Sequence, residues 1–455
     1  MALTPSARSV ALQILLQVEL KQAYSNLELN AALNKLSLDR RESGLVTELV
    51  YGTISRLNTL DWMANQLLKK PIHTLEPWVR NLLRVSIYQL QYLERIPDRA
   101  IVHEAVEEAK KRGNAKIAGF VNGVLRNVGR SKEQLQIPKQ GPKFKRIALG
   151  SSHPEWMVKR WLSFFGEQDT IAMCEINNTA PMMSIRCNLL KTDREQLTRM
   201  IEQQLPEAEW ERSKLAPDGI LLSHGGQIVH SQLFKEGYCT IQDESSMLVA
   251  YALNPKPGMD VLDTCAAPGG KTTHLAERMA NEGRIVALDI HPHKLDLIRQ
   301  NANRLGTAII ETRSADAREL PMDLKSGEFD RILVDAPCSG FGVIRRKPDL
   351  KWQKSEKDIQ EIAEIQYQIL EQAVQCLKPG GKLVYSTCTV DPEENSKLVQ
   401  RFVKEHPFVK LDDSLQGDMP EVLHSYFHRS GSYVQILPHY FGSDGFFISR
   451  MERIQ

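Results

Sequence analysis

Two cysteines stand where a sulfur nucleophile would be useful. Cys338 ends the run Asp335-Ala-Pro-Cys338, Cys388 ends the run Ser386-Thr-Cys388, and each run follows a predicted strand. A single cysteine is more often a small buried hydrophobe than a catalyst. Two that reach the same edge of one sheet are harder to explain in that way, so we interpret both as candidates for covalent chemistry. We interpret the other cysteines outside the glycine turn as buried packing residues: Cys174, Cys187, Cys239 and Cys376.

A glycine turn precedes both cysteines in the chain. The stretch Cys265-Ala-Ala-Pro-Gly-Gly-Lys271 lies between a short apolar run typical of a buried strand and a predicted helix. Glycine lets a ligand approach the backbone closely, and a helix N-terminus offers unpaired N–H groups. The stretch fits neither the dinucleotide fingerprint nor the P-loop pattern. It therefore predicts a site for a nucleoside that carries a carboxylate and an amine.

Three acids follow successive predicted strands. Asp289 comes 19 residues after Gly270, Asp316 follows the third strand, and Asp335 ends the fourth. The ends of parallel strands meet at one edge of a sheet, where ligands bind. We expect Asp289 to accept the ribose hydroxyls and Asp316 to accept from the adenine amino group.

Strands and helices alternate from residue 255 onward, which predicts a doubly wound, Rossmann-like α/β sheet. The last two apolar runs predict an antiparallel hairpin at its end. The expected strands are 261–264, 285–289, 308–311, 331–335 and 382–386, and the expected helices lie near 271–281, 292–305 and 356–377.

The first third of the chain differs in pattern and in charge. Apolar residues recur at helical spacing to about residue 130, which predicts an all-α domain of six or seven helices. Residues 1–150 hold 23 Lys and Arg against 13 Asp and Glu, whereas the remainder carries a net charge of −8. This asymmetry favours contact with a polyanion, although a solvated helical surface explains it equally well. The stretches 41–52 and 119–126 resemble NusB-like domains, which bind RNA.

Short strands near 183–188 and 219–223 flank a helix near 194–204. This pattern predicts a small α+β domain of the RNA-recognition type. The expected division is therefore a helical domain over 1–140, the small domain over 141–240 and the sheet domain over 241–455.

Together these motifs resemble those of the Sun/Fmu (RsmB) family, RNA cytosine-5 methyltransferases of 16S ribosomal RNA that use S-adenosylmethionine. The resemblance also covers Gly340–Asp349 and Asp391–Asn395 and spans most of the chain. It implies that Cys388 is the nucleophile, that Asp335 holds the cytosine N3 edge and contacts the cofactor, and that Cys338 assists product release. It also implies a target base that leaves its stack, in single-stranded or distorted RNA.

The resemblance further implies that the backbone of the glycine turn receives the methionine part of the cofactor. The residues concerned are Cys265, Ala266, Ala267, Pro268, Gly269, Gly270 and Lys271. We expect Lys271 to lie close to this site, where it would lower a thiol pKa or bind the cofactor. Arg345, Arg346 and Lys347 are candidate phosphate contacts, with solvated surface as the equal alternative.

Two other functions stay open. In a DNA cytosine methyltransferase Cys338 would be the nucleophile, and a non-catalytic assembly factor would bind ribosomal RNA without methylating it. The chain has no signal region and no long apolar run, so we expect a cytoplasmic protein without membrane contact. Seven scattered cysteines without a C-x-x-C pair argue against disulfides and against a zinc site.

Overall fold

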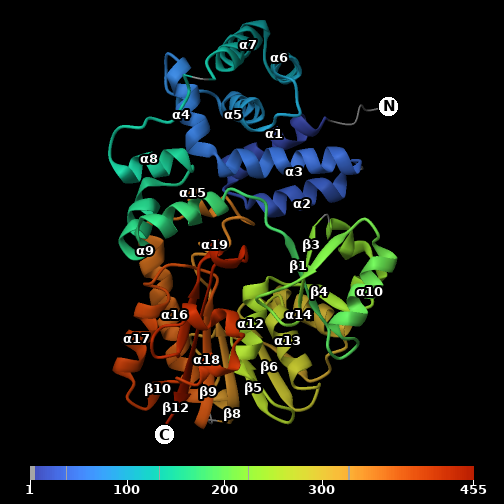
Figure 1. Ribbon diagram of the computed structural model, residues 1–455, viewed down its shortest axis with the longest axis vertical. Helices are drawn as coiled ribbons and strands as arrows, with labels where there is room; N and C mark the ends of the chain where they lie inside the picture. Colours follow the sequence, from blue (N-terminus) through green and yellow to red (C-terminus); the bar gives the residue numbers. More distant parts are fainter. Residues whose placement is uncertain (1–5, 37, 133, 224, 326–327, 455) are drawn as a thin grey trace. The chain divides into compact units, whose positions relative to one another are not determined.

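The computed structural model describes residues 6–36, 38–132, 134–223, 225–325 and 328–454. The chain forms two compact units (Figure 1). Unit 1 comprises Met1–Ala180 together with Ile344–Lys354, and unit 2 comprises Pro181–Val343 together with Ser355–Gln455. The chain therefore leaves unit 2 shortly after Cys338 and returns to it eleven residues later.

Unit 1 is helical, as the periodicity predicted. Its first seven α-helices are α1 (Ala7–Lys21), α2 (Ser25–Lys35), α3 (Arg40–Ser55), α4 (Leu57–Leu67), α5 (Pro77–Tyr92), α6 (Asp98–Arg112) and α7 (Ala115–Arg130). Side-chain caps begin several of them: Asp39 accepts from Glu42 N–H, and Asn114 accepts from Lys116 and Ile117 N–H. Helix α5 is buried along most of its length and contacts α1, α3, α4, α6 and α7, so it forms the centre of this core. The described part of the unit also contains the α-helices α8 (Lys143–Gly150), α9 (Glu155–Ile176) and α15 (Leu350–Gln353) and the short 3-10 helix η1 (Ile72–Thr74).

Unit 2 begins with a small antiparallel sheet of order β2-β3-β1-β4. Its elements are β1 (Met183–Cys187), α10 (Arg194–Gln204), β2 (Glu209–Arg212), β3 (Gly219–Ser223) and β4 (Cys239–Ile241). The prediction of a small α+β domain is confirmed, but two of its strands, β2 and β4, were not predicted. Strand β2 is mostly exposed and charged, and β4 has only three residues, so neither shows a strand pattern in the sequence.

The larger sheet has the order β10-β12-β9-β8-β5-β6-β7, with β11 paired to β12. Strands β5 to β9 run parallel, and β10, β11 and β12 pair antiparallel, which confirms the doubly wound α/β prediction with its terminal hairpin. The strands are β5 (Asp260–Asp263), β6 (Arg284–Asp289), β7 (Ile310–Ser314), β8 (Phe329–Asp335), β9 (Leu377–Thr387), β10 (Val409–Leu411), β11 (Tyr433–Ile436) and β12 (Phe446–Arg453).

Helices cover both faces of this sheet. Alternate strand residues such as Leu333 and Val384 pack toward α12 (Glu244–Leu253) and α13 (Gly270–Arg278). Their neighbours Val334 and Tyr385 pack toward α16 (Glu356–Cys376) and α17 (Ser396–Glu405). The strand order reverses beside β5, whose neighbours are β6 and β8. In sheets of this type the ligand crevice opens at such a switch point, outside the carboxyl ends of the strands.

One strand lies two residues later than expected. The sequence predicted 308–311, whereas β7 spans Ile310–Ser314. Helix α14 (Pro292–Leu305) ends on Gly306 in the left-handed conformation, and the Ala308 N–H then bonds to the Asn281 side chain. The chain therefore joins the sheet only after this turn. Among the described residues, no helix combines the length and the apolar character that crossing a membrane would need.

Candidate active site

The glycine turn joins β5 to α13 as predicted. Gly269 has φ of 99°, and a Cβ there would lie 3.1 Å from the Ile298 Cα, so both conformation and space favour glycine. Gly270 begins α13, and a Cβ on it would meet no heavy atom within 4 Å. The Thr272 hydroxyl donates to Asp263 Oδ2 over 2.7 Å, which ties the first turn of the helix to the end of β5.

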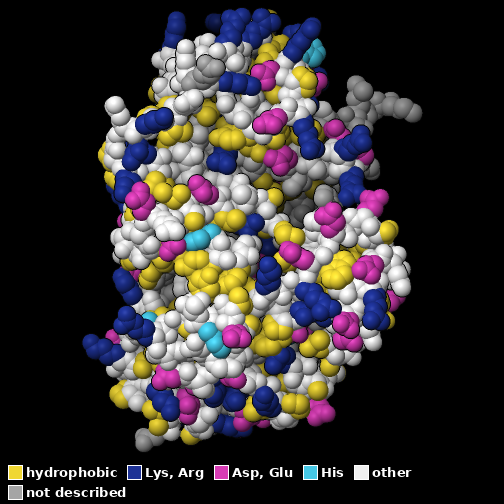
Figure 2. All heavy atoms as spheres, in the orientation of Figure 1, with side chains coloured by type: hydrophobic (Ala, Val, Ile, Leu, Met, Phe, Trp, Pro, Cys, Tyr) yellow, Lys and Arg dark blue, Asp and Glu magenta, His cyan; other side chains and the backbone are white. Residues whose placement is uncertain are grey.

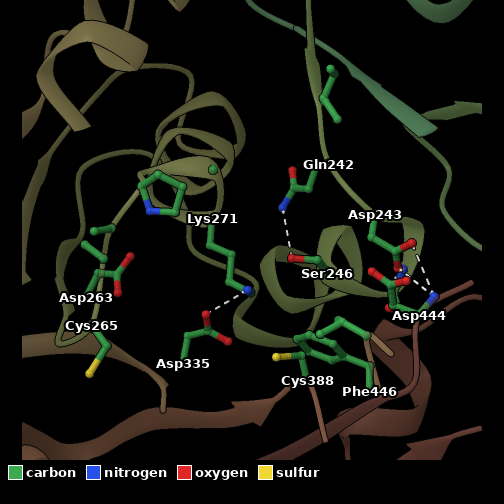
Figure 3. Close-up of a pocket in the computed structure, with 17 residues that line it drawn as sticks. Gln242, Asp243, Ser246, Asp263, Cys265, Lys271, Asp335, Cys388, Asp444 and Phe446 are labelled. Atoms are coloured by element: carbon green, nitrogen blue, oxygen red, sulfur yellow. Dashed lines mark hydrogen bonds and ion pairs between the residues drawn. The ribbon is translucent and has the colours of Figure 1, made fainter. Parts of the chain in front are cut away.

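A cavity of about 240 Å³ opens beside this turn (Figure 3). Three groups of residues line it. The turn contributes Cys265, Ala266, Ala267, Pro268, Gly270 and Lys271; strand ends contribute Asp263, Asp335 and Cys388; other segments contribute Ile241, Gln242, Asp243, Ser245, Ser246, Val343, Asp444 and Phe446. The structure thus brings together most of the predicted turn residues, Asp335 and Cys388.

Lys271 and Asp335 form an ion pair at the cavity. Lys271 Nζ lies 2.8 Å from Asp335 Oδ2, and the Ser386 hydroxyl donates to Asp335 Oδ1 over 2.8 Å. Burial acts to lower the pKa of Lys271, but Asp335 and then Cys388 outweigh it and raise that pKa above its ordinary value. Lys271 therefore stays an ammonium whose charge interacts with both the carboxylate and the Cys388 sulfur.

The two predicted cysteines meet. Cys338 Sγ lies 3.3 Å from Cys388 Sγ, although Cys338 itself is not among the residues that line the cavity. The contact with Cys388, together with burial, raises the pKa of Cys338 well above that of a free thiol. Cys338 is therefore a protonated thiol in contact with the sulfur that faces the cavity.

Glu394 connects the two loops that carry Cys338 and Cys388. Its carboxylate accepts from Ser339 N–H over 2.8 Å, from the Ser339 hydroxyl over 2.5 Å and from Gln366 Nε2 over 3.0 Å, and Thr389 Oγ1 lies 3.3 Å away. Burial raises its pKa to about 7. Glu394 lies in Asp391–Asn395, one of the stretches that resemble the family. No role was predicted for it, because an acid in a charged run is usually exposed.

Asp263 is a second acid that the sequence reasoning missed. It is 1% exposed, lines the cavity, and its Oδ1 has no hydrogen-bond partner in the described part of the protein. Burial raises its pKa to about 7. A buried acceptor without a donor is costly, and a ligand ammonium would satisfy it. The cavity therefore fits a ligand with an amine, as the turn predicted.

Two predicted acids do not line this cavity. Asp289 ends β6, where its Oδ1 accepts from His291 N–H over 2.9 Å. Asp316 is paired with Arg318, with 2.6 Å between Asp316 Oδ2 and Arg318 Nη2. Their contacts with ribose and adenine stay predictions, as does the phosphate contact of Arg345, Arg346 and Lys347, which belong to unit 1.

One wall of the cavity had no counterpart in the sequence predictions. Residues 241–243, 245 and 246 reach it from β4 and the start of α12, and Asp444 and Phe446 reach it from the start of β12. The Asp444 N–H lies 3.2 Å from both carboxylate oxygens of Asp243, which joins these two segments (Figure 3). The polar run Gln242-Asp-Glu-Ser-Ser246 before an apolar helix was the available signal.

Comparison with known families agrees with this architecture. Residues 250–452 match the family described as 16S rRNA methyltransferase RsmB/F. Residues 5–130 match the NusB family, and residues 153–229 match the ferredoxin-like domain of RsmF/B-like methyltransferases.

Whole-chain relatives carry the same combination. The chain is 47% identical over 449 residues to the probable ribosomal RNA small subunit methyltransferase B of Bacillus subtilis, covering 98% of this chain and 99% of the relative. It is 34% identical to the ribosomal RNA small subunit methyltransferase B of Pectobacterium atrosepticum, with 98% of each chain covered. The crystal structure of PH0851 superimposes with a TM-score of 0.80 and 25% identity, covering 99% of this chain and all of PH0851.

These matches extend over the helical domain, the small domain and the sheet domain alike, and the cavity holds the thiol, the acid and the glycine turn that the motifs predicted. The chain therefore belongs to the RsmB/F family of 16S rRNA methyltransferases with an N-terminal NusB domain, and it is an S-adenosylmethionine-dependent RNA cytosine-5 methyltransferase.

Proposed function

We propose that this protein methylates C5 of one cytosine of 16S ribosomal RNA through a temporary bond between Cys388 and C6 of that base. The observation that carries the proposal is the cavity itself, where Cys388 contacts a second thiol and lies within the field of the Lys271–Asp335 pair. We also keep the division into domains 1–140, 141–240 and 241–455 as a proposal.

The groups at the cavity can activate C5 of cytosine for methylation. C5 of cytosine is a poor nucleophile, but addition of the Cys388 thiolate to C6 turns the ring into an enamine. In that addition the C5=C6 electron pair moves toward C5 and N3. The proton given up by the Cys388 thiol passes to N3 by way of Asp335, which then accepts a hydrogen bond from the new N3–H. The Ser386 and Lys271 contacts hold the Asp335 carboxylate in a fixed orientation for this contact.

The second thiol, Cys338, acts in the release of the product. After methyl transfer C5 must lose its proton, so that the C5=C6 bond forms again and the bond from C6 to sulfur breaks. Cys338 is held as a thiol 3.3 Å from the departing sulfur and can donate its proton to it, and the Cys338 thiolate so formed accepts the proton that C5 loses, so that both cysteines end as thiols. We therefore assign Cys388 to bond formation and Cys338 to release.

S-adenosylmethionine, when bound, supplies an electrophilic methyl group on a sulfonium centre. Asp263 would hold its ammonium, since Asp263 Oδ1 is buried at the cavity and lacks a donor among the described residues. The backbone of residues 265–271 would receive the remainder of the methionine part. Asp289 and Asp316 are proposed for ribose and adenine on the strength of the family resemblance.

Unit 1 presents a surface suited to the RNA. A groove of about 690 Å³ runs between α6 and α7, with Leu90 and Leu125 on its floor. Basic groups exceed acidic ones along it: it is lined by Arg99, His103, Lys110, Arg126 and Arg130, against Asp98 and Glu107. Figure 2 shows Lys and Arg side chains gathered over the end of unit 1 that α6 and α7 form. Such a groove suits a phosphate backbone, so we propose that unit 1 binds the RNA directly.

A covalent trap tests the assignment. A 16S RNA fragment with 5-fluorocytosine at the target cannot lose a proton from C5, so it should hold the wild-type enzyme in an adduct. Cys388→Ala should abolish this adduct. With ordinary RNA, Cys338→Ala should accumulate an adduct that wild type does not. Cys376→Ala, at a buried thiol of α16, is the matched control and should behave as wild type.

Other outcomes separate the alternatives. Loss of the adduct in Cys338→Ala, with retention in Cys388→Ala, would assign the nucleophile as in DNA cytosine methyltransferases. Failure of calorimetry to detect S-adenosylmethionine binding would favour a non-catalytic assembly factor. Bisulfite mapping of ribosomal RNA from a strain that lacks the protein would identify the cytosine.

A further inference from the structure

The chain crosses between the two units beside the catalytic loop. Cys338 belongs to unit 2, but Ile344, six residues later, already belongs to unit 1, and the chain returns to unit 2 at Ser355. Residues 344–354 include the short helix α15. We call this segment the strap. The loop that carries Cys338 is thus covalently continuous with a piece of the other unit.

Lys351 holds the strap inside unit 1. Its side chain is fully buried, and Nζ donates to Ser55 O over 2.8 Å, to Ser152 O over 2.9 Å and to Asn178 Oδ1 over 3.1 Å. These acceptors lie at the end of α3, between α8 and α9, and just after α9. An ammonium has three donors, and all three are used here. Burial lowers the pKa of Lys351 to about 7, which shows that an ammonium is costly at this place, so a lysine here requires an explanation beyond packing.

Neighbouring residues anchor the strap at further points. Trp352 Nε1 donates to Ile54 O over 2.8 Å, and its ring packs against the core of unit 1. The Ser25 hydroxyl donates to the buried Asp349 carboxylate. Arg345 Nη2 donates to Ala180 O over 3.1 Å. The strap is therefore an internal part of unit 1 and not a surface loop.

The catalytic loop itself is held within unit 2. Ser339 bonds to Glu394, Gly342 N–H donates to Cys388 O over 2.9 Å, and Gly445 N–H donates to Gly342 O over 2.8 Å. A Cβ on Gly342 would lie only 1.9 Å from Gly445 O, so this end has no spare room. Residues 336–343 are thus held in unit 2 at Ser339 and again at Gly342, and two residues after Gly342 the chain enters the anchored segment of unit 1.

We propose that the strap lets the RNA-binding unit position the loop that carries Cys338, with Lys351 as the positioning residue. This inference rests on the proposed function, in which Cys338 acts in product release. Slackening the strap should disturb both cysteines, because Gly342, two residues before the strap, donates its N–H to Cys388 O, and Cys338 lies four residues before Gly342 in the same loop.

The test is Lys351→Met in the full-length enzyme. We expect kcat to fall at least about tenfold, with little change in KM for RNA, because a small displacement of a reacting group is costly. We also expect an enzyme–RNA adduct to accumulate with ordinary RNA, as in Cys338→Ala. Lys357→Met, which removes an exposed lysine of α16, should leave kcat and adduct level unchanged. Trp352→Phe removes the bond to Ile54 O and part of the ring that packs on unit 1, but it keeps an aromatic side chain. It should show the same effects more weakly, and it tests the proposal if Lys351→Met fails to fold.

Two results would contradict the proposal that the strap positions the catalytic loop. The first is a folded Lys351→Met or Trp352→Phe enzyme with lowered thermal stability but wild-type kcat. The second is a loss confined to KM, since that would indicate weakened RNA binding alone. If Cys338→Ala itself accumulates no adduct, the assigned role of Cys338 fails, and the kcat of Lys351→Met still decides whether the strap positions the site.

Discussion

Lys271 Nζ lies 2.8 Å from Asp335 Oδ2 at the carboxyl end of β8, and Lys378 Nζ lies 2.8 Å from Asp330 Oδ1 near the start of the same strand. The two pairs have the same length and similar carboxylate exposure, but only Lys271 and Asp335 line the cavity. Since an ion pair of this kind adds little stability when partly exposed, its place at the cavity is the feature to test.

Asp335→Asn should lower the rate of methyl transfer at least about 100-fold, since positioned acid–base groups contribute roughly 10²- to 10⁴-fold. The amide retains the size of the carboxylate but loses its charge beside Lys271. Single-turnover transfer from labelled S-adenosylmethionine measures the effect. Asp330→Asn removes the matching pair and should leave the rate unchanged; an equal loss in both variants would show that the effect comes from folding.

Asp263→Asn should weaken S-adenosylmethionine binding by about 10- to 100-fold, the range expected when a charge-assisted hydrogen bond worth about 1.5–3 kcal/mol is lost. Thr272 would still find an oxygen to donate to, whereas the new NH₂ group would face the ligand ammonium. Isothermal titration calorimetry measures the affinity. Asp260→Asn, at the exposed start of the same strand, is the control. Unchanged affinity in Asp263→Asn would remove this residue from the cofactor site.

Cofactor affinity should also rise with pH through about 7. Burial raises the pKa of Asp263 to about 7, so at lower pH the free protein holds a neutral carboxyl that must lose its proton to pair with an ammonium. The affinity of wild type should therefore increase by up to about tenfold per pH unit below this pKa and level off above it. Asp263→Asn should lack this dependence. A wild-type affinity that is constant between pH 6 and 8 would contradict the assignment.

The sheet, the glycine turn and the contact of two cysteines were predictable because one rule governs them. Parallel strands bring their carboxyl ends to one edge, so Lys271, Asp335 and Cys388 converge whatever their separation in sequence. The wall formed by residues 241–243, 245 and 246 and by Asp444 was not predictable, because those residues reach the cavity from segments outside the alternating strands and helices. Lys351 was missed for a different reason: it lies in a basic run, and only the fold shows that it is buried.

Glu394 should make the protein less stable as pH rises from about 4.5 to 7. Its pKa is raised to about 7 in the fold by burial, so over this range the folded chain holds a proton that the unfolded chain has released. The free energy of unfolding should then fall by about 1.4 kcal/mol per pH unit from this group. Glu394→Gln does not titrate, so the stability of wild type relative to this variant should decrease across the range and become constant above pH 7. Denaturant unfolding at several pH values measures it, with Glu393→Gln, at a more exposed acid paired with Lys397, as the control that keeps the wild-type slope.

Replacement of Arg126 and Arg130 by Gln should weaken RNA binding without slowing the chemistry. Both line the groove between α6 and α7, where they would neutralise phosphates. We expect the slope of log affinity against log salt to decrease by about one for each arginine removed, and kcat at saturating RNA to match wild type. Lys35→Gln removes an exposed charge from α2, outside this groove, and serves as the control. A double variant with unchanged salt dependence would show that the groove does not bind the RNA, and a protein partner would then be the better candidate for this surface.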